Sequence, residues 1–381
     1  MSSLDARLDV LRGPVEPLPH SARTLAALTA NPRCDRRTLL DAAGIDKPAL
    51  AAHLGLPQPM KKSRLALDHG LAFERQVTDP EQGVLVSLLR QSLQLPVPYA
   101  SYKDISNLRH GNGASPPGLR RTHTSQLILG TAEGRLTPPP ALLDHPVLTL
   151  NVAGRQTYLE PDVIALRHDD VFHIVEIRSF PVIHGRADPL KAAVALTQAA
   201  AYILALRELL TSAEPPTTQV SDTVVLINPR NFTRQPTATT YNAAPQIKSL
   251  SRHLARLDRL PDLLDTLPPG TTCDLATSPD GTPTRPRDNL IAALAIMKPH
   301  YTPGCRHHCD LATHCRTEAR NRGSIGALGT TVRDDLAGID TLHTALDLAD
   351  GHVRAISGHE DTTHALRHAQ RIHDELTRDS T

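Results

Sequence analysis

Apolar residues in the first third of the chain recur every three or four positions. This spacing predicts helices over 20–56, 64–79, 81–95 and 120–129. Ser21 can cap the first of these stretches, Asp35 begins a second helix within it, and Pro96 and Pro98 end the stretch over 81–95. A segment rich in Gly, Pro and Ser predicts a loop at 110–117. We therefore expect the chain to be largely helical before its first strands.

The pattern changes after residue 146, where apolar and polar residues begin to alternate. Alternation predicts a meander of three successive strands, over 147–152, 156–166 and 171–177. A long helix rich in Ala and Leu follows at 188–211, and a short apolar run at 223–227 predicts a buried fourth strand. A strand–helix–strand crossover of this kind implies a mixed sheet. Further helices are expected over 247–267, 289–297 and 332–378.

Composition limits what this α/β fold can be built from. Hydrophobic residues make up 40% of the 381 residues, but aromatic residues only 3%, so the core must consist mainly of Leu, Ala, Val and Ile. The formal net charge of +1 does not indicate a nucleic-acid partner, so any DNA surface would be a local patch. We see no apolar window long enough to span a bilayer and no signal-peptide pattern, and expect a cytoplasmic protein without a membrane partner.

Two acidic residues lie on neighbouring expected strands. Asp162 and Glu176 flank the turn between the second and third strands at nearly equal distances. Antiparallel strands pair side by side, so both carboxylates can project from one sheet face towards one point. Carboxylates that close repel each other unless they share a proton or a cation such as Mg²⁺. Pro161 removes one ladder donor and favours a bulge or an edge beside Asp162.

Spacing alone leaves another explanation open, because acidic residues on strands usually face water. Local motifs favour a site. They are Glu160-Pro161-Asp162, Glu176-Ile177-Arg178 and Gln198-Ala199-Ala200-Ala201-Tyr202, in the order strand, strand, helix. Together they resemble the PD-(D/E)xK nuclease superfamily, and most closely its RecB-like branch, which includes the AddB nuclease domain and the CRISPR-adaptation nucleases.

The resemblance covers roughly residues 30 to 320 and implies a restriction-endonuclease-like fold, with a mixed central sheet flanked by helices and with further helices towards both ends. It implies that Asp162 and Glu176 bind Mg²⁺ or Mn²⁺ with the backbone carbonyl of Ile177. The family also has an acidic or His residue on an upstream helix, and Gly70-Leu71-Ala72-Phe73-Glu74 offers Glu74 for this role.

The same resemblance places Gln198 and Tyr202 near the metal and the DNA backbone. Four positions apart, they share one face of the expected helix, which an ordinary polar helix face would also explain.

Arg178 stands where the family pattern has Lys. Arginine is effectively always protonated and cannot act as a base, although it can stabilise charge on a phosphate. We therefore expect activity to be weakened. Lys191 could replace the missing Lys, although a solvated helix residue is the more common role for such a position.

Three of the five cysteines lie within eleven residues: Cys305, Cys309 and Cys315. In a cytosolic protein this spacing indicates a metal or cluster site rather than disulfides, and a fourth ligand is needed. The RecB-like branch often carries a [4Fe-4S] cluster held by one early and three late cysteines. Cys34 matches the early position, which leaves Cys273 as a free thiol.

Zinc is the competing cofactor, because His307, His308 and His314 lie among the late cysteines and Cys₃His is a common zinc set. The late cysteines also depart from the family pattern, which usually has two residues between the first pair and here has three. A cluster that joins residue 34 to residue 315 would close a long loop and thereby stabilise the fold.

We therefore expect a RecB-like nuclease domain over 1–330, with its ends joined by the cluster, and a helical extension over 331–381. The expected activity is metal-dependent hydrolysis of DNA, at single strands or ends, in repair or defence. The alternatives are an iron–sulfur DNA-binding module that does not cut, and a zinc-stapled interaction protein.

Overall fold

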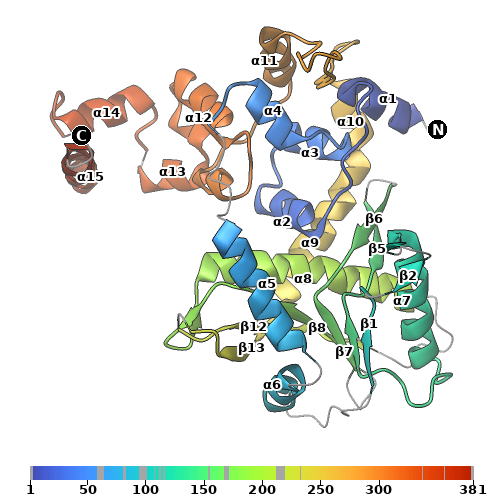
Figure 1. Ribbon diagram of the computed structural model, residues 1–381. Coiled ribbons are helices and arrows are strands. Elements are labelled where there is room, and N and C mark those ends of the chain that lie inside the picture. Colours follow the sequence, from blue (N-terminus) through green and yellow to red (C-terminus); the bar gives the residue numbers. More distant parts are fainter. Residues whose placement is uncertain are drawn as a thin grey trace. The chain divides into compact units, whose positions relative to one another are not determined.

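The fold is known from a computed structural model (Figure 1). It describes residues 3–57, 64–79, 83–93, 101–106, 108–110, 113–114, 116–152, 155–166, 171–211, 219–231, 233–336, 338–355 and 357–378.

The chain forms two compact units, each made of separate stretches of sequence. Unit 1 contains Met1–Pro17, Ala30–Pro59 and Asp262–Thr381, and unit 2 contains Leu18–Thr29 and Met60–Pro261. These units are defined by contacts within the chain and do not test the expected domains. The nuclease domain at 1–330 and the extension at 331–381 therefore stay a prediction.

Unit 2 is built on a seven-stranded sheet. Its strands run in the order β1 (Tyr102–Asp104), β4 (Leu142–Asp144), β7 (Val163–Leu166), β8 (Val171–Ile177), β12 (Thr223–Pro229) and β13 (Pro236–Asn242), and β11 (Gln219–Val220) also pairs with β8. The β1–β4, β8–β11 and β8–β12 pairs are parallel, whereas β4–β7, β7–β8 and β12–β13 are antiparallel. The predicted α/β class with a mixed central sheet is therefore confirmed.

The predicted three-stranded meander is wrong. The expected strand over 156–166 divides at Glu160-Pro161-Asp162 into β6 (Arg155–Leu159) and β7. β6 pairs with β5 (Leu148–Val152) in a separate hairpin, and β7 joins the central sheet between β4 and β8. The division has a physical reason, since Pro161 has no N–H to donate to a ladder. Among the described residues, four further short strands form two antiparallel pairs: β2 (Arg109–His110) with β3 (Gly113–Ala114), and β9 (Val182–Ile183) with β10 (Arg186–Ala187).

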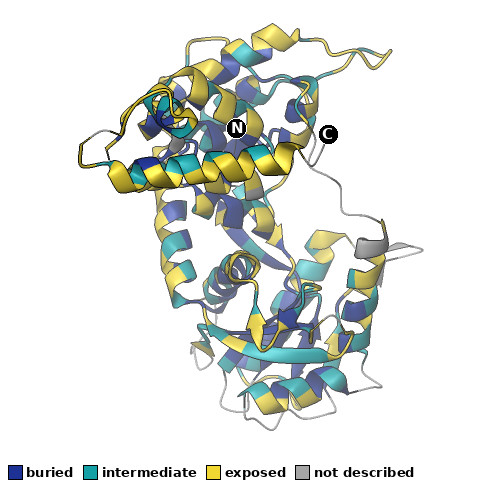
Figure 2. Cartoon of the chain, turned by 90° about the vertical axis from the view of Figure 1, so that its left-hand side faces the viewer, coloured by how far each residue is buried: buried dark blue, intermediate teal, exposed yellow. Residues whose placement is uncertain are grey.

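Helices cover both faces of the sheet. Side chains at odd positions of β7 and β8, such as Val163 and Val175, pack against α5 (Arg64–Thr78) and α6 (Val84–Leu93). Side chains at even positions, such as Ile164 and Ile174, pack against α8 (Pro189–Leu210). Three more helices share that second core: α2 (Ala22–Ala30), α7 (Pro117–Ala132) and α9 (Ala244–Arg256). Buried residues are concentrated in these strands and in the helix faces towards them (Figure 2).

Helix α8 is the central helix of unit 2. Asp188 caps it by accepting hydrogen bonds from the backbone N–H groups of Leu190 and Lys191. Ala199, Ala200 and Ala201 are all completely buried, so this helix lies close against its neighbours. By length and composition α8 could cross a membrane, which the sequence analysis did not expect, but 56% of its most apolar window is buried inside the fold. Such burial is typical of a core helix.

In its described residues, unit 1 contains helices joined by irregular segments and no named strand. Its helices are α1 (Ser3–Arg12), α3 (Asp35–Ala42), α4 (Lys47–His53), α11 (Arg287–Ile296), α12 (Ala312–Asn321), α13 (Thr330–Asp335), α14 (Leu342–Asp350) and α15 (Glu360–Arg378), with short 3₁₀ turns η2 (Pro303–His307) and η3 (Ile325–Leu328). The turn η1 (Leu257–Arg259) and α10 (Leu260–Asp265) lead from α9 towards it. The helical tail expected at 332–378 is thus three helices, and the stretch expected at 20–56 is also three.

Candidate active site

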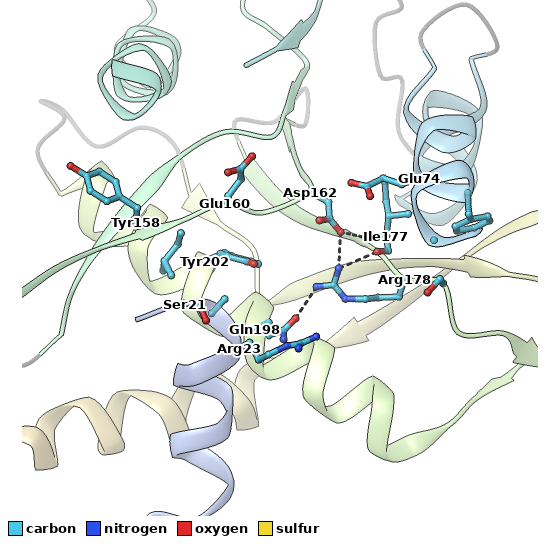
Figure 3. Close-up of a pocket in the computed structure, with 15 residues that line it drawn as sticks. Ser21, Arg23, Glu74, Tyr158, Glu160, Asp162, Ile177, Arg178, Gln198 and Tyr202 are labelled. Atoms are coloured by element: carbon cyan, nitrogen blue, oxygen red, sulfur yellow. Dashed lines mark hydrogen bonds and ion pairs between the residues drawn. The ribbon is translucent and has the colours of Figure 1, made fainter. Parts of the chain in front are cut away.

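Six of the predicted residues line one cavity of about 500 Å³ in unit 2: Glu74, Asp162, Ile177, Arg178, Gln198 and Tyr202 (Figure 3). They come from α5, from the link between β6 and β7, from the end of β8 and from α8. Glu176, the seventh, does not line the cavity and is completely buried beneath it. The structure therefore brings together residues that are up to 128 positions apart in the chain, from Glu74 to Tyr202.

Arg178 is the centre of this arrangement. Its Nη1 lies 2.9 Å from Oδ2 of Asp162 and donates to the carbonyl oxygen of Ile177 at 3.0 Å. Its Nη2 forms an ion pair with Glu176 and donates to Oε1 of Gln198 at 2.9 Å. One guanidinium group thus binds all three oxygen groups that the sequence analysis assigned to a metal ion on these strands.

The pairing of β7 with β8 sets the two acidic residues opposite each other. Val163 pairs with Val175, so the residues just outward on each strand are Asp162 and Glu176. Asp162 Oδ2 also accepts a hydrogen bond from the backbone N–H of Ile177 at 2.6 Å. Burial raises the pKa of Asp162, although the charge of Arg178 opposes the shift. Oε1 of Glu176 is buried with no hydrogen-bond partner among the described atoms, so this carboxylate has an acceptor left over.

Glu74 approaches the cavity from α5 and is held by His145, which the sequence analysis missed. Nε2 of His145 lies 3.2 Å from Oε1 of Glu74, and its Nδ1 lies 2.8 Å from Oδ1 of Asp144. Hydrogen bonds to Asp144 and Glu74 raise the pKa of His145 to about 10. His145 therefore carries a positive charge at neutral pH, and its backbone N–H also donates to the carbonyl of Asp162 at 2.9 Å.

Gln198 and Tyr202 lie on the cavity side of α8, as predicted from their spacing of four. Tyr202 is almost fully buried, and burial raises its pKa, so its hydroxyl keeps its proton. Lys191 does not line the cavity: it is largely exposed at the start of α8, with Nζ 3.9 Å from Oδ2 of Asp188. The structure gives no support for Lys191 as a replacement for the missing Lys.

Four residues in or beside the cavity were not predicted as site residues. Ser21 and Arg23 line the cavity from the start of α2, and Tyr158, with 43% of its surface exposed, lines it from β6. Asn228 on β12 does not line the cavity, but it donates hydrogen bonds to the carbonyls of Arg178 and Phe180 at 3.3 and 3.0 Å. These residues belong to no motif, so only their position in the fold connects them with the site.

The four predicted cysteines lie together in unit 1. Cys34, Cys305, Cys309 and Cys315 are all free, and the charges of neighbouring thiols act on the pKa of Cys34, Cys309 and Cys315. Burial raises the pKa of Cys309 to about 11 and that of Cys315 to about 12. We call these four residues the cysteine cradle.

Each sulfur of the cysteine cradle accepts hydrogen bonds. Nδ2 of Asn31 lies 3.1 Å from Sγ of Cys305, and Nη1 of Arg36 lies 3.2 Å from Sγ of Cys315. Backbone groups of Arg37 and His300 hydrogen-bond to Cys34, and that of Leu311 to Cys309. For Cys34, Cys309 and Cys315 these hydrogen bonds act to lower the pKa, against the larger effect of burial, which raises it.

The remaining cysteine and the histidines are less closely connected to the cysteine cradle. Cys273 is buried, its backbone N–H donates to the carbonyl of Leu11 at 2.7 Å, and burial raises its pKa to about 12. His314 lies 3.7 Å from Glu318 rather than against a sulfur, and the carbonyl of His308 accepts from Arg37 at 2.9 Å. The side chain of His307 lies outside the described part of the structure.

Within the described ranges, no three His, Cys, Asp or Glu side chains are grouped so that they could hold one metal ion. At the cavity, Arg178 forms ion pairs with Asp162 and Glu176, and His145 forms one with Glu74. A single ion would therefore require these side chains to move.

Comparisons with known proteins do not identify a family for this chain. No protein-family model matches the chain, and no curated protein matches it. Among solved structures, the crystal structure of a "Putative exonuclease" from Eubacterium rectale is similar at 10% identity, over 69% of this chain and 84% of that chain, with a TM-score of 0.30. A TM-score of this size carries no argument about function, so the site must be judged by its own chemistry.

Proposed function

We propose that this chain is a metal-dependent DNA nuclease that hydrolyses phosphodiester bonds in single strands or at ends, and that a [4Fe-4S] cluster stabilises it. The observation that carries the proposal is the meeting of Asp162, Glu176, Ile177 and Gln198 at one guanidinium, in a cavity that Glu74 and Tyr202 also line. Residues of the motifs that predicted a metal-dependent nuclease site are therefore close in space.

The donor set suits a hard divalent cation. Glu74, Asp162, Glu176 and the carbonyl of Ile177 would hold Mg²⁺ or Mn²⁺, which bind oxygen ligands of this kind. The unpartnered Oε1 of Glu176 supports this fit, because a buried acceptor without a donor needs a cation or a proton. When bound, such an ion neutralises phosphate charge and makes a bound water more acidic.

The other side chains of the cavity are suited to bind a phosphodiester. Arg178 would stabilise negative charge as it develops on the phosphate, because a guanidinium remains charged at any working pH. Tyr202 keeps its proton and would donate a hydrogen bond. Arg23, beside the start of α2, would bind a neighbouring phosphate on the same strand.

Tyr158 supports a preference for single-stranded DNA. Its ring is partly exposed at the cavity, and an unpaired base can stack on an exposed aromatic ring. A duplex keeps its bases stacked on one another, so we expect this ring to favour single strands and frayed ends.

The cysteine cradle would hold the cluster. Four thiols whose charges affect one another, each with a hydrogen-bond donor, fit a cluster with four thiolate ligands. They support the cluster over a Cys₃His zinc site, since Cys34 supplies a fourth thiol and His314 lies 3.7 Å from Glu318 rather than at a sulfur. The cluster would contribute stability and no step of the hydrolysis.

One specific observation favours a second function, a DNA-binding module that does not cut. Arg178 already neutralises Asp162 and Glu176, and the chain lacks the motif Lys at this position. Such a protein would use the cavity to hold a phosphate without hydrolysing it.

The deciding experiment is cleavage of labelled single- and double-stranded DNA by the pure, cluster-loaded chain with Mn²⁺. We expect the wild type to cut, and Asp162→Ala and Glu176→Ala each to lose roughly a hundredfold or more of the rate. A folded wild type that binds DNA without cutting it would leave the binding module as the function. A wild type that neither cuts nor binds DNA would exclude both.

Iron and zinc analysis of the pure protein tests the cofactor. We expect about four irons and four acid-labile sulfides per chain, as the four-cysteine ligand set implies. A colourless protein with one zinc would overturn the cluster.

A further inference from the structure

We infer that the guanidinium of Arg178 is a built-in cation that occupies the place of a divalent metal ion between Asp162 and Glu176, so that this side chain competes with the metal for the site. The inference rests on the proposed function, because it concerns the metal that the proposed nuclease would use.

The contacts of Arg178 are those that a metal ion would make. Its two terminal nitrogens bind Oδ2 of Asp162 and the carbonyl of Ile177 (Figure 3), and they also form an ion pair with a carboxylate oxygen of Glu176. These are the three oxygen groups proposed as metal ligands on the strands. An ion brought to the same place would find its ligands already bound to a positive group.

Burial explains why the guanidinium remains there. Glu176 is completely buried, and the side chain of Asp162 is only 18% exposed, so water cannot solvate either negative charge well. Arg178 supplies a permanent positive charge, and it would repel a second cation as well as take its ligands.

Gln198 adds a further anchor. Its Oε1 accepts from Nη2 of Arg178 at 2.9 Å, so acceptors from β8, from the residue before β7 and from α8 fix the guanidinium. A planar guanidinium has five donors and can bind all of these acceptors, whereas a Lys ammonium has three. Lysine at this position would therefore be a weaker competitor for the metal.

Direct titration of Mn²⁺ into the cluster-loaded full chain, without DNA and followed by the EPR signal of free Mn²⁺, tests the inference. The variant is Arg178→Met, which keeps most of the side-chain volume and removes the charge. The control is Arg207→Met on α8, which removes an arginine that lies outside the cavity and forms a 2.6 Å ion pair with Asp222.

We expect Arg178→Met to bind Mn²⁺ at least about tenfold more tightly than the wild type, because it loses both the repulsion and the competing ligand contacts. Adding Asp162→Asn should remove this gain, and Arg207→Met should match the wild type. Equal affinity of Arg178→Met and wild type, or a gain that survives Asp162→Asn, would overturn the inference.

If circular dichroism shows that Arg178→Met does not fold, Arg178→Lys carries the same comparison. We expect Arg178→Lys to bind Mn²⁺ about threefold more tightly than the wild type, since it keeps the positive charge and has fewer hydrogen-bond donors. An affinity equal to that of the wild type would overturn the inference. Failure of the proposed function is separate: it would appear as absence of DNA cleavage by the wild type, whatever the Mn²⁺ affinities are.

Discussion

Buried charges in this protein are held by groups from distant parts of the chain. Arg36 in unit 1 is 1% exposed and binds both oxygens of Glu318, at 2.6 and 3.0 Å. The same guanidinium donates to the carbonyl of Leu294 at 2.7 Å and to Sγ of Cys315 at 3.2 Å. Arg36 thus connects the helix that follows Cys34 with the helix that contains Cys315.

The first residue-scale prediction concerns this contact. Arg36→Met should lower the free energy of unfolding by roughly 1–3 kcal/mol, because Glu318, whose side chain is 21% exposed, loses its buried partner. It should also speed the loss of iron, since Cys315 loses its donor. Denaturant unfolding and iron release over time measure the two effects. Arg33→Met, at an exposed position of the same segment, is the control and should change neither; equal iron release in both variants would contradict the role of Arg36.

A second residue-scale prediction follows from the raised pKa of His145. A histidine whose folded pKa is about 10 stabilises the fold fully below its ordinary value of 6.5, and the stabilisation disappears as pH rises through 10. At pH 6 the free energy of unfolding of the wild type should therefore be about 1–2 kcal/mol higher than that of His145→Asn; the difference is kept this small because the group is partly exposed. Above pH 10 the difference should disappear. Asn tolerates the left-handed backbone at this position, where φ is 48°.

Urea unfolding at several pH values measures this difference. His364→Asn, on the exposed face of α15, should give a difference that does not change with pH. A His145→Asn difference that is constant between pH 6 and 10 would show that the ion pairs with Glu74 and Asp144 do not form.

The sequence motifs contain most of the residues at the candidate site, but they do not include the residues that hold those side chains in place. Asp162, Glu176, Gln198 and Tyr202 could be predicted because the order of their motifs matches strand, strand and helix. His145 could not, since it lies in the short link between β4 and β5 and reaches Glu74 only through the tertiary fold.

At the scale of elements, the long helix α8 and the central strands β8 and β12 followed directly from apolar periodicity. The strands that were missed lack this signal. β4 has only three residues, and β13 is rich in Thr and half-buried, so its pairing with β12 depends on tertiary position. The division between β6 and β7 was missed because Pro161 was expected to bend one strand rather than end it.

The close packing of α8 makes an element-scale prediction. Ala200 is completely buried against the sheet, so Ala200→Leu should cost about 1–3 kcal/mol of stability by overpacking. Ala193→Leu, at an exposed position of the same helix, should be close to neutral. Urea unfolding of both variants provides the comparison; equal stability would mean that α8 does not lie tightly on the sheet.

At the scale of the whole molecule, the chain divides its two candidate sites between its two units. The cysteine cradle lies in unit 1 and the cavity in unit 2. Cys34 and Cys305 are 271 positions apart, so a cluster that joins them removes much of the conformational freedom of the unfolded chain. The compact units could not be predicted from the sequence, because each is assembled from separate stretches.

This division predicts which unit depends on the cluster. Cys34→Ala should lose iron and expose unit 1 to faster amide hydrogen exchange, while β8 and β12 in unit 2 stay protected. Cys273→Ala should keep its iron, because Cys273 is outside the cysteine cradle. Mass spectrometry of exchange and iron analysis measure both, and loss of iron from Cys273→Ala would show that the four ligands are wrongly assigned.

The most direct test of the account is the location of Mn²⁺ in a crystal of the chain with a short single-stranded oligonucleotide, found from its anomalous scattering. We expect an Mn²⁺ peak between Asp162 and Glu176, beside the carbonyl of Ile177, with the guanidinium of Arg178 moved onto a DNA phosphate. A bound oligonucleotide with no Mn²⁺ at these oxygens would contradict the assignment of this cavity as a metal-dependent nuclease site.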